Sequence, residues 1–328
     1  MSTRPALRLP SLEDIEWARR RVAGAAIRTP LIKLPPFAAE SRWPEVYLKL
    51  ENLQPVGSFK IRGAASALLG VSAGDLHDGV CTASAGNMAQ GVAWCALHAG
   101  VPCKVIIPDG APEAKRDAIT ALGAELVPVP FADWWRVMET HDPMDVPGWF
   151  VHPVENVDVM AGNGTIALEI IEDLPAVDAV IVPFGGGGLI SGIGAGMRAL
   201  KPQCKVIAAE VETAAPLRAS LDAGEARAID RIPSFVDGIG GSAVLPAMWP
   251  LVRQVVDDAI VVSLAEIEDA IRLLVRRARV VAEGAGASSV AAARKLDFRR
   301  IVCVVSGGNI DASVLASILL KAIHTGTP

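Results

Sequence analysis

Short apolar runs and helix-length segments alternate along most of this chain. Apolar runs at residues 79–83, 102–107, 179–183, 260–263 and 301–305 precede segments with helical spacing at 86–98, 112–122, 189–200, 264–277 and 311–323. Strands separated by helices need crossover connections, which build parallel sheets. Strands of such sheets are buried on both faces, and this explains continuous apolar runs such as 179–182. The pattern therefore predicts an α/β fold.

The remaining segments extend this pattern. It predicts further helices at 12–23 and 159–171, and further strands at 46–50, 125–129, 149–152 and 205–210. Residues 141–148 are rich in Pro and Asp, so we expect a loop there. Ligands of open parallel sheets bind beyond the carboxyl ends of the strands. The polar residues that follow the strands are therefore the first place to search for a site.

The composition raises the question of a membrane protein. Hydrophobic residues make up 51% of the 328 and charged residues 20%, and windows 79–103 and 179–197 contain no Lys, Arg, Asp or Glu. The second window carries Pro183 and four consecutive glycines, and a glycine costs about 1 kcal/mol relative to alanine inside a helix. The first carries Ser84 and Asn87, which a helix facing lipid would avoid. We therefore expect buried strand, turn and helix in both windows, and no membrane span.

Charge and cysteine usage indicate which partners and which cellular compartment to expect. The formal net charge is −5 and no basic patch is present, so nucleic acid is not an expected partner. The five cysteines lack Cys-x-x-Cys spacing and mostly lie in apolar runs, which predicts free, buried thiols. The N-terminus lacks the apolar segment of a secretory signal, and Ser11 begins a helix-capping sequence instead. We therefore expect a cytoplasmic protein.

Glycine-rich turns follow three of the predicted strands, at residues 84–91, 183–189 and 306–309. Each lies at the start of a predicted helix, where free N–H groups and the helix dipole favour an anion such as phosphate. Glycine loops alone are equally compatible with tight structural turns. The four glycines of the second turn also match the start of a dinucleotide-binding fingerprint, with Glu210 ending the next strand. A nicotinamide-dependent dehydrogenase is therefore an alternative.

One lysine changes this interpretation. Lys60 stands in the sequence Gly-Ser-Phe-Lys-Ile-Arg-Gly at 57–63, at the start of a predicted helix. Taken alone, it would be a solvated surface charge. Together with a phosphate-binding loop, a lysine amine can hold pyridoxal phosphate as a Schiff base while glycine N–H groups bind the phosphate.

With this segment the sequence resembles the fold-type II pyridoxal-phosphate enzymes, and among them the serine/threonine dehydratase (threonine ammonia-lyase) and serine racemase family. The lysine segment of that family is present here in full. The further matches run in order over nearly the whole chain, and jointly they are highly specific. They are Ser84-Ala-Gly-Asn87, Ala89-Gln-Gly91, Phe150-Val-His-Pro153, Ala161-Gly-Asn-Gly-Thr-Ile-Ala-Leu-Glu169, Gly185–Leu189, Asp237-Gly238, Glu283-Gly-Ala-Gly-Ala287 and Val305-Ser-Gly-Gly-Asn-Ile310.

The resemblance implies a fold like that of the tryptophan synthase β chain, with two open parallel-sheet domains and the active site between them. The small domain would span residues 53–151 and carry the lysine and a substrate-carboxylate loop. The large domain would span 1–52 and 152–328 and carry the phosphate loop and a serine facing the pyridine nitrogen. A homodimer or homotetramer is expected.

The resemblance also implies roles for individual residues. Lys60 would hold the cofactor and then remove the α-proton, and Ser84 could exchange a proton on the opposite face, so both are expected to be catalytic. The cofactor-binding residues implied are Phe59, Lys60, Asn87, Gly185, Gly186, Gly187, Gly188, Leu189, Glu283 and Ser306. The substrate-binding residues implied are Ser84, Ala85, Gly86, Asn87, Met88 and Asp237.

The serine at the pyridine nitrogen has a mechanistic consequence. A hydroxyl does not protonate pyridine as a carboxylate does, so the ring withdraws electrons less strongly. Losing a β-hydroxyl as the α-proton leaves avoids accumulating negative charge. The family and Ser306 together imply an ammonia-lyase that converts L-threonine or L-serine to a 2-oxo acid and ammonia. The alternatives are a serine racemase, a dehydratase of a bulkier 3-hydroxy amino acid such as hydroxyaspartate or phenylserine, and a cofactor-binding protein without turnover.

The chain departs from the family pattern at several positions. Met88 replaces a usual His, which would make the substrate pocket more apolar and admit a bulkier substrate. Val56 replaces a polar residue, and Asn163 replaces a Gln. The tryptophans of segment 131–135 are expected in the core or at an interface rather than at the substrate.

The family's metal site is also altered. It uses a Glu, a backbone carbonyl and an Asp. Glu210 and Ala214 align with the first two ligands, but Pro216 stands where the Asp would be. A divalent cation site is therefore doubtful from the sequence.

Overall fold

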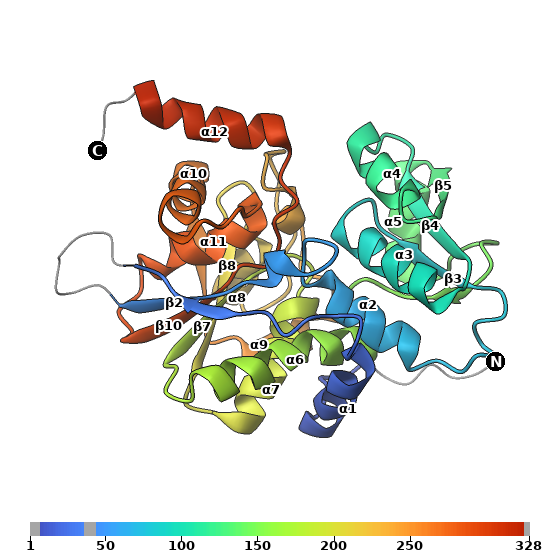
Figure 1. Ribbon diagram of the computed structural model, residues 1–328, viewed down its shortest axis with the longest axis horizontal. Coiled ribbons are helices and arrows are strands. Elements are labelled where there is room, and N and C mark those ends of the chain that lie inside the picture. The colour runs from blue at the N-terminus through green and yellow to red at the C-terminus, as the bar shows by residue number, and fades with distance from the viewer. Residues whose placement is uncertain (1–6, 36–43, 325–328) are drawn as a thin grey trace.

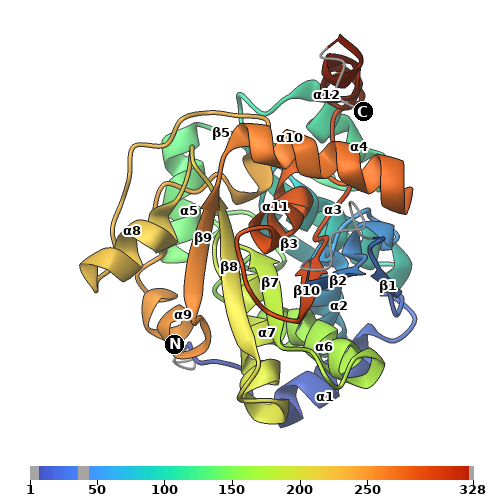
Figure 2. The ribbon, with the colours of Figure 1, turned by 90° about the vertical axis from the view of Figure 1, so that its left-hand side faces the viewer.

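The computed structural model describes residues 7–35 and 44–324, which form two parallel-sheet units (Figure 1). The larger sheet has the strand order β1-β2-β10-β7-β8-β9, and Figure 2 shows it from β9 at one edge to β1 at the other. Every neighbouring pair is parallel except β1 and β2, which pair antiparallel at the edge. The strands are β1 (Leu31–Lys33), β2 (Glu45–Lys49), β7 (Ala179–Pro183), β8 (Lys205–Val211), β9 (Asp258–Val262) and β10 (Arg300–Val304).

The smaller sheet has the order β5-β4-β3-β6 and is parallel throughout. Its strands are β3 (Val80–Ala83), β4 (Cys103–Pro108), β5 (Glu125–Val129) and β6 (Trp149–Phe150). The helices between them are α3 (Asn87–Ala99), α4 (Glu113–Thr120) and α5 (Phe131–Thr140). Both sheets therefore follow from the alternation of apolar runs and helices along the chain.

Alternate residues of the central strand β10 enter two different cores. Ile301 and Cys303 pack with α10 (Leu264–Leu273) and α11 (Gly284–Ala293), and α12 (Ala312–His324) lies on the same side of the sheet. Val302 and Val304 pack with α6 (Val157–Asp173), α7 (Gly188–Leu200) and α9 (Trp249–Val255) on the other face. Burying a Val or Ile side chain stabilises a fold by about 1.5–3 kcal/mol. Both faces of β10 thus contribute to the stability of the fold. This explains why the strand is apolar at every position from Ile301 onward.

The smaller sheet is also covered on both faces. Val80 and Val105 pack against α2 (Lys60–Leu69) and α3. Ala83 and Ile106 pack against α5 on the opposite face. Helix α2 joins the two units, because it also packs closely against α6.

Two glycines let helices approach one another closely. A Cβ atom at Gly162 of α6 would lie 2.2 Å from the carbonyl oxygen of Arg62 on α2. A Cβ atom at Gly192 of α7 would lie 2.1 Å from the carbonyl oxygen of Met160 on α6. Helices α2, α6 and α7 therefore form a tight layer, and α1 (Leu12–Val22) packs against α6 and α7 at its outer side.

The predicted elements are present, with differences at several ends. The helix predicted at 264–277 changes to a π-helical turn (Leu274–Ala278), and Arg279 ends it with a φ of +61°. The strand predicted at 149–152 has only the two residues of β6. Residues 141–148 contain no helix or strand, as predicted. Elements that the pattern did not predict are β1, α5, α8 (Pro216–Ala223), α9, α11 and the 3-10 turns Glu51–Leu53 and Asp237–Ile239.

The two charge-free windows are strand, turn and helix, as predicted. Within the part of the chain that the structure describes, no helix is long and apolar enough to cross a membrane. All five cysteines are free and buried, and burial raises the pKa of each thiol. The expectation of free, buried thiols is confirmed.

Candidate active site

Lys60 is the first residue of α2, where the two units meet. Its Nζ lies 5.2 Å from the centroid of the Phe59 ring. The backbone of α3 passes directly behind it, because a Cβ atom at Gly91 would lie 3.2 Å from the carbonyl carbon and oxygen of Lys60. Burial lowers the pKa of Lys60 to about 8, and the negative charge of Glu283 opposes that effect. Near neutral pH the amine is thus much closer to its neutral, nucleophilic form than an ordinary lysine.

Glu283 brings the predicted site residues together. Its Oε1 accepts a hydrogen bond of 3.0 Å from Nδ2 of Asn87, which begins α3. A Cβ atom at Gly307 would lie 2.5 Å from the same oxygen, and one at Gly238 would lie 3.6 Å from it. Burial raises the pKa of Glu283 to about 7. This carboxyl therefore links three segments that the sequence analysis assigned to one site.

Asn309 completes this arrangement. Its Nδ2 donates to Oδ1 of Asn87 at 2.8 Å and to the carbonyl oxygen of Val56 at 2.9 Å. Gly57 has a φ of +70°, and a Cβ atom there would lie 2.3 Å from Oδ1 of Asn309. Sequence reasoning placed Asn309 in a glycine-rich turn but gave it no role. Its position after a buried strand was the signal that could have found it.

The loop after β10 pairs with the lysine segment through the backbone. The Phe59 N–H donates to the carbonyl oxygen of Ser306 at 3.0 Å, and the Gly308 N–H donates to that of Gly57 at 2.8 Å. Ser306 itself is only 3% exposed. The serine predicted to face the pyridine nitrogen therefore lies directly beside the predicted cofactor lysine.

The four-glycine loop connects β7 to α7. Gly187 has a φ of +93° and precedes the first helical residue, Gly188, so the first N–H groups of α7 lack partners within the helix. The loop fits tightly against its neighbours, since a Cβ atom at Gly186 would lie 2.5 Å from Cγ2 of Val154 and one at Gly185 would lie 3.1 Å from the carbonyl oxygen of Gly238. Free N–H groups in a loop that only glycine fits suit the phosphate of pyridoxal phosphate.

The predicted substrate-carboxylate loop follows β3. Oγ of Ser84 accepts a hydrogen bond of 3.2 Å from the Gly86 N–H, and α3 begins at the next residue. Met88 is 1% exposed and packs in the core of the small sheet. Its side chain thus points to that core, and the prediction that it shapes the substrate pocket has no support from its contacts. At Ala85, Gly86 and Met88 this leaves the backbone N–H groups for substrate binding.

The other departures from the family pattern have structural explanations. Nδ2 of Asn163 on α6 donates to the carbonyl oxygen of Gly188 at 3.3 Å, so this residue supports the glycine loop. Val56 is buried in the core of the small sheet. Trp134 and Trp135 are half-buried on α5 beside that sheet, in agreement with a packing role.

Asp237 lies at the solvent-exposed edge of the candidate site rather than in its buried part. It is an exposed residue that forms an ion pair with Lys115 of α4. This pair joins the smaller unit to the loop that carries Gly238, whose neighbours include Glu283 and Ala285.

The carboxyl group of Glu210, the first candidate metal ligand, is bonded to backbone N–H groups. Its two carboxylate oxygens accept hydrogen bonds from the N–H groups of Leu217 and Arg218, at 2.8 and 2.7 Å. Pro216 is the first residue of α8, a position that suits proline because its nitrogen needs no hydrogen bond there. Burial raises the pKa of Glu210 to about 7. The carboxyl group therefore binds the first turn of α8.

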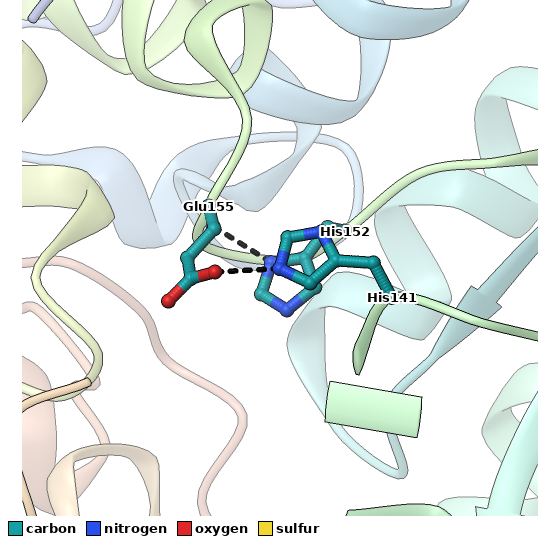
Figure 3. A group of neighbouring side chains, drawn as sticks. All are labelled: His141, His152 and Glu155. Carbon is teal, nitrogen blue, oxygen red and sulfur yellow. Dashed lines mark hydrogen bonds and ion pairs between the residues drawn. The ribbon is translucent and has the colours of Figure 1, made fainter. Parts of the chain in front are cut away.

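His141, His152 and Glu155 form a second polar cluster (Figure 3). His141 Nε2 lies 2.5 Å from Oε2 of Glu155, and the two imidazole rings are stacked 4.0 Å apart at an angle of 10°. Imidazole lone pairs lie in the ring plane, so two parallel rings cannot both direct a lone pair at one ion. His152 Nδ1 also accepts from the N–H groups of Val154 and Glu155. The cluster thus fixes the turn that presses Val154 against the glycine loop.

Known proteins are similar to this chain over most of its length. The L-threonine ammonia-lyase of Thermotoga maritima is 40% identical, over 95% of this chain and 79% of that protein. The catabolic L-threonine dehydratase TdcB of Escherichia coli strain K12 is 38% identical, over 94% of this chain and 95% of that protein.

Solved structures show the same fold. Maize serine racemase superposes with a TM-score of 0.83 at 30% identity, covering 97% of this chain and 99% of that one. The processed form of threonine deaminase isoform 2 from Solanum lycopersicum superposes with a TM-score of 0.81 at 30% identity, covering 97% and 95%. The predicted fold of the fold-type II pyridoxal-phosphate enzymes is confirmed. Residues 22–307 match the sequence model of a family described as "Pyridoxal-phosphate dependent enzyme", and the chain belongs to that family.

Proposed function

We propose that this protein is a deaminating dehydratase that converts L-threonine or L-serine to a 2-oxo acid and ammonia. The observation that carries the proposal is that a lysine of lowered pKa lies in a segment bonded to the buried Ser306, while Glu283 joins Asn87 to Gly238, which borders the glycine loop at Gly185. The activities named for the relatives in Thermotoga maritima and Escherichia coli support it.

The residues present fit pyridoxal phosphate. Lys60 would hold it through its amine, the N–H groups of residues 185–189 would bind its phosphate, and Ser306 would face its ring nitrogen. Asn87 and Phe59 would lie beside the ring. When bound, the cofactor withdraws electrons from the substrate's α-carbon and so makes its proton acidic.

The protein's own groups then direct the outcome. Lys60 accepts the α-proton, because an amine of pKa about 8 is a competent base near neutral pH. Residues 84–88, which form the loop before α3 and the start of that helix, bind the substrate carboxylate through backbone N–H groups and the helix dipole. Ser306 offers a hydroxyl rather than a carboxylate, so charge on the α-carbon is best relieved by expelling the β-hydroxyl.

The second candidate activity is racemisation of serine. It is favoured by one observation, the hydroxyl of Ser84 within the carboxylate loop, which could return a proton to the other face of the α-carbon. The structural similarity to maize serine racemase fits the same activity.

One set of incubations tests both. The purified protein loaded with pyridoxal phosphate is mixed with L-threonine, L-serine, hydroxyaspartate or phenylserine, and 2-oxo acid and D-amino acid are measured separately. We expect oxo acid from the two small substrates. D-serine as the main product would replace the dehydratase by the racemase, and oxo acid only from the bulky substrates would correct the substrate class. Lys60→Ala is the control for background reaction.

The cellular setting is part of the same proposal. Five buried thiols of raised pKa suit a reducing compartment, so we place the enzyme in the cytoplasm. We also expect a homodimer or homotetramer, as the resemblance to the family implies. Light scattering after gel filtration measures the oligomer, and a monomer at micromolar concentration would contradict it.

A further inference from the structure

Four buried charges lie on the far side of α2 from the cofactor lysine. Lys49, Glu51, Arg62 and Glu169 are all less than 9% exposed, and their formal charges cancel. We call this group the Arg62 cluster. Removing water from four charges is costly, so such a group is maintained only where its hydrogen bonds are nearly complete.

Arg62 has that complete set of hydrogen bonds. Its Nε and Nη2 donate to the two oxygens of Glu51 at 2.8 and 2.9 Å. Its Nη1 and Nη2 donate to the two oxygens of Glu169 at 2.7 and 2.9 Å. Nη1 also donates to Oγ1 of Thr165 at 3.0 Å. One planar guanidinium therefore grips two carboxylates at once, which a lysine ammonium cannot do.

The remaining members close the cluster. Nζ of Lys49 donates to Glu169 at 2.5 Å and to the carbonyl oxygen of Thr29 at 2.7 Å. Glu51 follows β2, and Glu169 lies on α6, so both carboxylates belong to the elements of the larger sheet. Arg62 therefore attaches α2 to that larger unit, although α2 also packs with the smaller one.

The start of α2 needs such an attachment. Lys60 is its first residue, the preceding Phe59 provides no side-chain cap, and a positive charge is unfavourable at the positive end of the helix dipole. A first turn of this kind gains no stability from a side-chain cap or from the helix dipole. Arg62 stands in that same turn, its N–H donates to the carbonyl oxygen of Phe59 at 2.9 Å, and its own carbonyl oxygen touches α6 at Gly162.

We propose that Arg62 is a positioning residue, which holds the first turn of α2 against the larger unit and so fixes where the Lys60 amine lies relative to Ser306 and the glycine loop. The lysine is then held on both sides: Phe59 is bound to Ser306 before it, and Arg62 to Glu51 and Glu169 after it. The proposal rests on the proposed use of Lys60 as the cofactor lysine, but on no particular substrate.

The test compares Arg62→Lys with wild type. The variant keeps the charge and loses the double grip on the two carboxylates. We expect the cofactor-free protein to react with pyridoxal phosphate at least tenfold more slowly, followed by the visible absorbance of the bound cofactor. After borohydride reduction, peptide mapping reports how much cofactor is attached to Lys60. In the loaded enzyme we expect kcat to fall at least tenfold while KM changes less than threefold, because the carboxylate loop lies on α3.

Arg21→Lys is the matched control. Arg21 forms an exposed ion pair with Asp158 of α6 and also reaches the carbonyl oxygen of Ser66 on α2. It thus joins the same two helices, away from the first turn. We expect loading within twofold of wild type.

A milder variant keeps the test valid if Arg62→Lys fails to fold. Thr165→Val keeps the side-chain shape and removes the hydrogen bond that Oγ1 accepts from Arg62, together with the one that it donates to the carbonyl oxygen of Gly162 on its own helix. It should slow loading in the same direction by about twofold to fivefold. If Arg62→Lys and Thr165→Val lower the melting temperature but load cofactor at the wild-type rate, the cluster is only a stabilising one and the proposal is wrong. Loading needs no amino acid, so a wild type that binds cofactor yet lacks dehydratase activity would overturn the proposed function alone.

Discussion

Replacing Glu283 by glutamine should change how the protein's stability depends on pH. Burial raises the pKa of this carboxyl from 4.5 to about 7. Between those two pH values the folded protein retains a proton that the unfolded chain has released. The carboxyl therefore favours the folded state fully below pH 4.5, and this contribution is lost as the pH rises through 7.

The size of the effect follows from the pKa difference. One pKa unit corresponds to about 1.4 kcal/mol, so wild type should lose about 3 kcal/mol of unfolding free energy from this group between pH 4.5 and pH 8. Glutamine does not ionise, and its carbonyl oxygen can still accept the hydrogen bond from Asn87. The variant should therefore lack this part of the pH dependence and gain stability relative to wild type as the pH rises.

Urea unfolding of the cofactor-free wild type and variant at pH 4.5, 6, 7 and 8 measures how the unfolding free energy depends on pH. Glu172→Gln is the control, because Arg19 and Arg28 lower the pKa of that carboxyl, so its contribution to stability is present above pH 4.5 and is lost only as the pH falls below that value. Its difference in unfolding free energy from wild type should therefore stay nearly constant between pH 6 and pH 8. If the curves of Glu283→Gln and wild type run parallel from pH 4.5 to 8, the carboxyl of Glu283 is not held in a protonated form and the reasoning is refuted.

Three further outcomes are expected. Gly57→Ala should destabilise the fold by about 1–3 kcal/mol in thermal or urea unfolding, because an L-residue is strained at a φ of +70° and the new Cβ would meet Asn309. Gly186→Ala should weaken cofactor binding by about tenfold in equilibrium titration, since its Cβ would displace Val154 or the phosphate loop; unchanged affinity would place the phosphate elsewhere. The rate of cofactor loading should rise with pH through about 8 and then level off as the Lys60 amine becomes neutral, and a rate that is flat from pH 7 to 9 would contradict the lowered pKa.

The sequence predicted the fold best where a buried apolar run is followed directly by residues typical of a turn. The run at 179–183 followed by four glycines predicted strand, loop and helix, because a strand buried on both faces leaves an unbroken apolar run and a phosphate loop leaves glycines. Helix α11 was not predicted for a related reason. Its residues are Gly, Ala, Ser and Val and are buried on every side, so no polar face marks the helical period.

Buried charge was the hardest feature to find from the sequence. Glu169 lies 107 residues from Arg62 along the chain, and nothing local distinguishes either from a surface charge. The same holds for His141, whose partner Glu155 lies beyond an irregular loop. Motifs from the family resemblance supplied Lys60, Asn87 and Ser306, whereas Glu283 came without its partners and Asn309 was missed. Only the fold shows that the Glu283 carboxyl bonds Asn87, which in turn bonds Asn309.

The pairing of the lysine segment with the loop after β10 also constrains the order of assembly. The two hydrogen bonds from Phe59 to Ser306 and from Gly308 to Gly57 join positions about 250 residues apart, a large part of the length of the chain. During synthesis from the N-terminus, Lys60 is made about 250 residues before its partner loop. The proposed cofactor site is therefore incomplete on any nascent chain that has not reached residue 308, and such a chain lacks the pairing that holds the lysine segment.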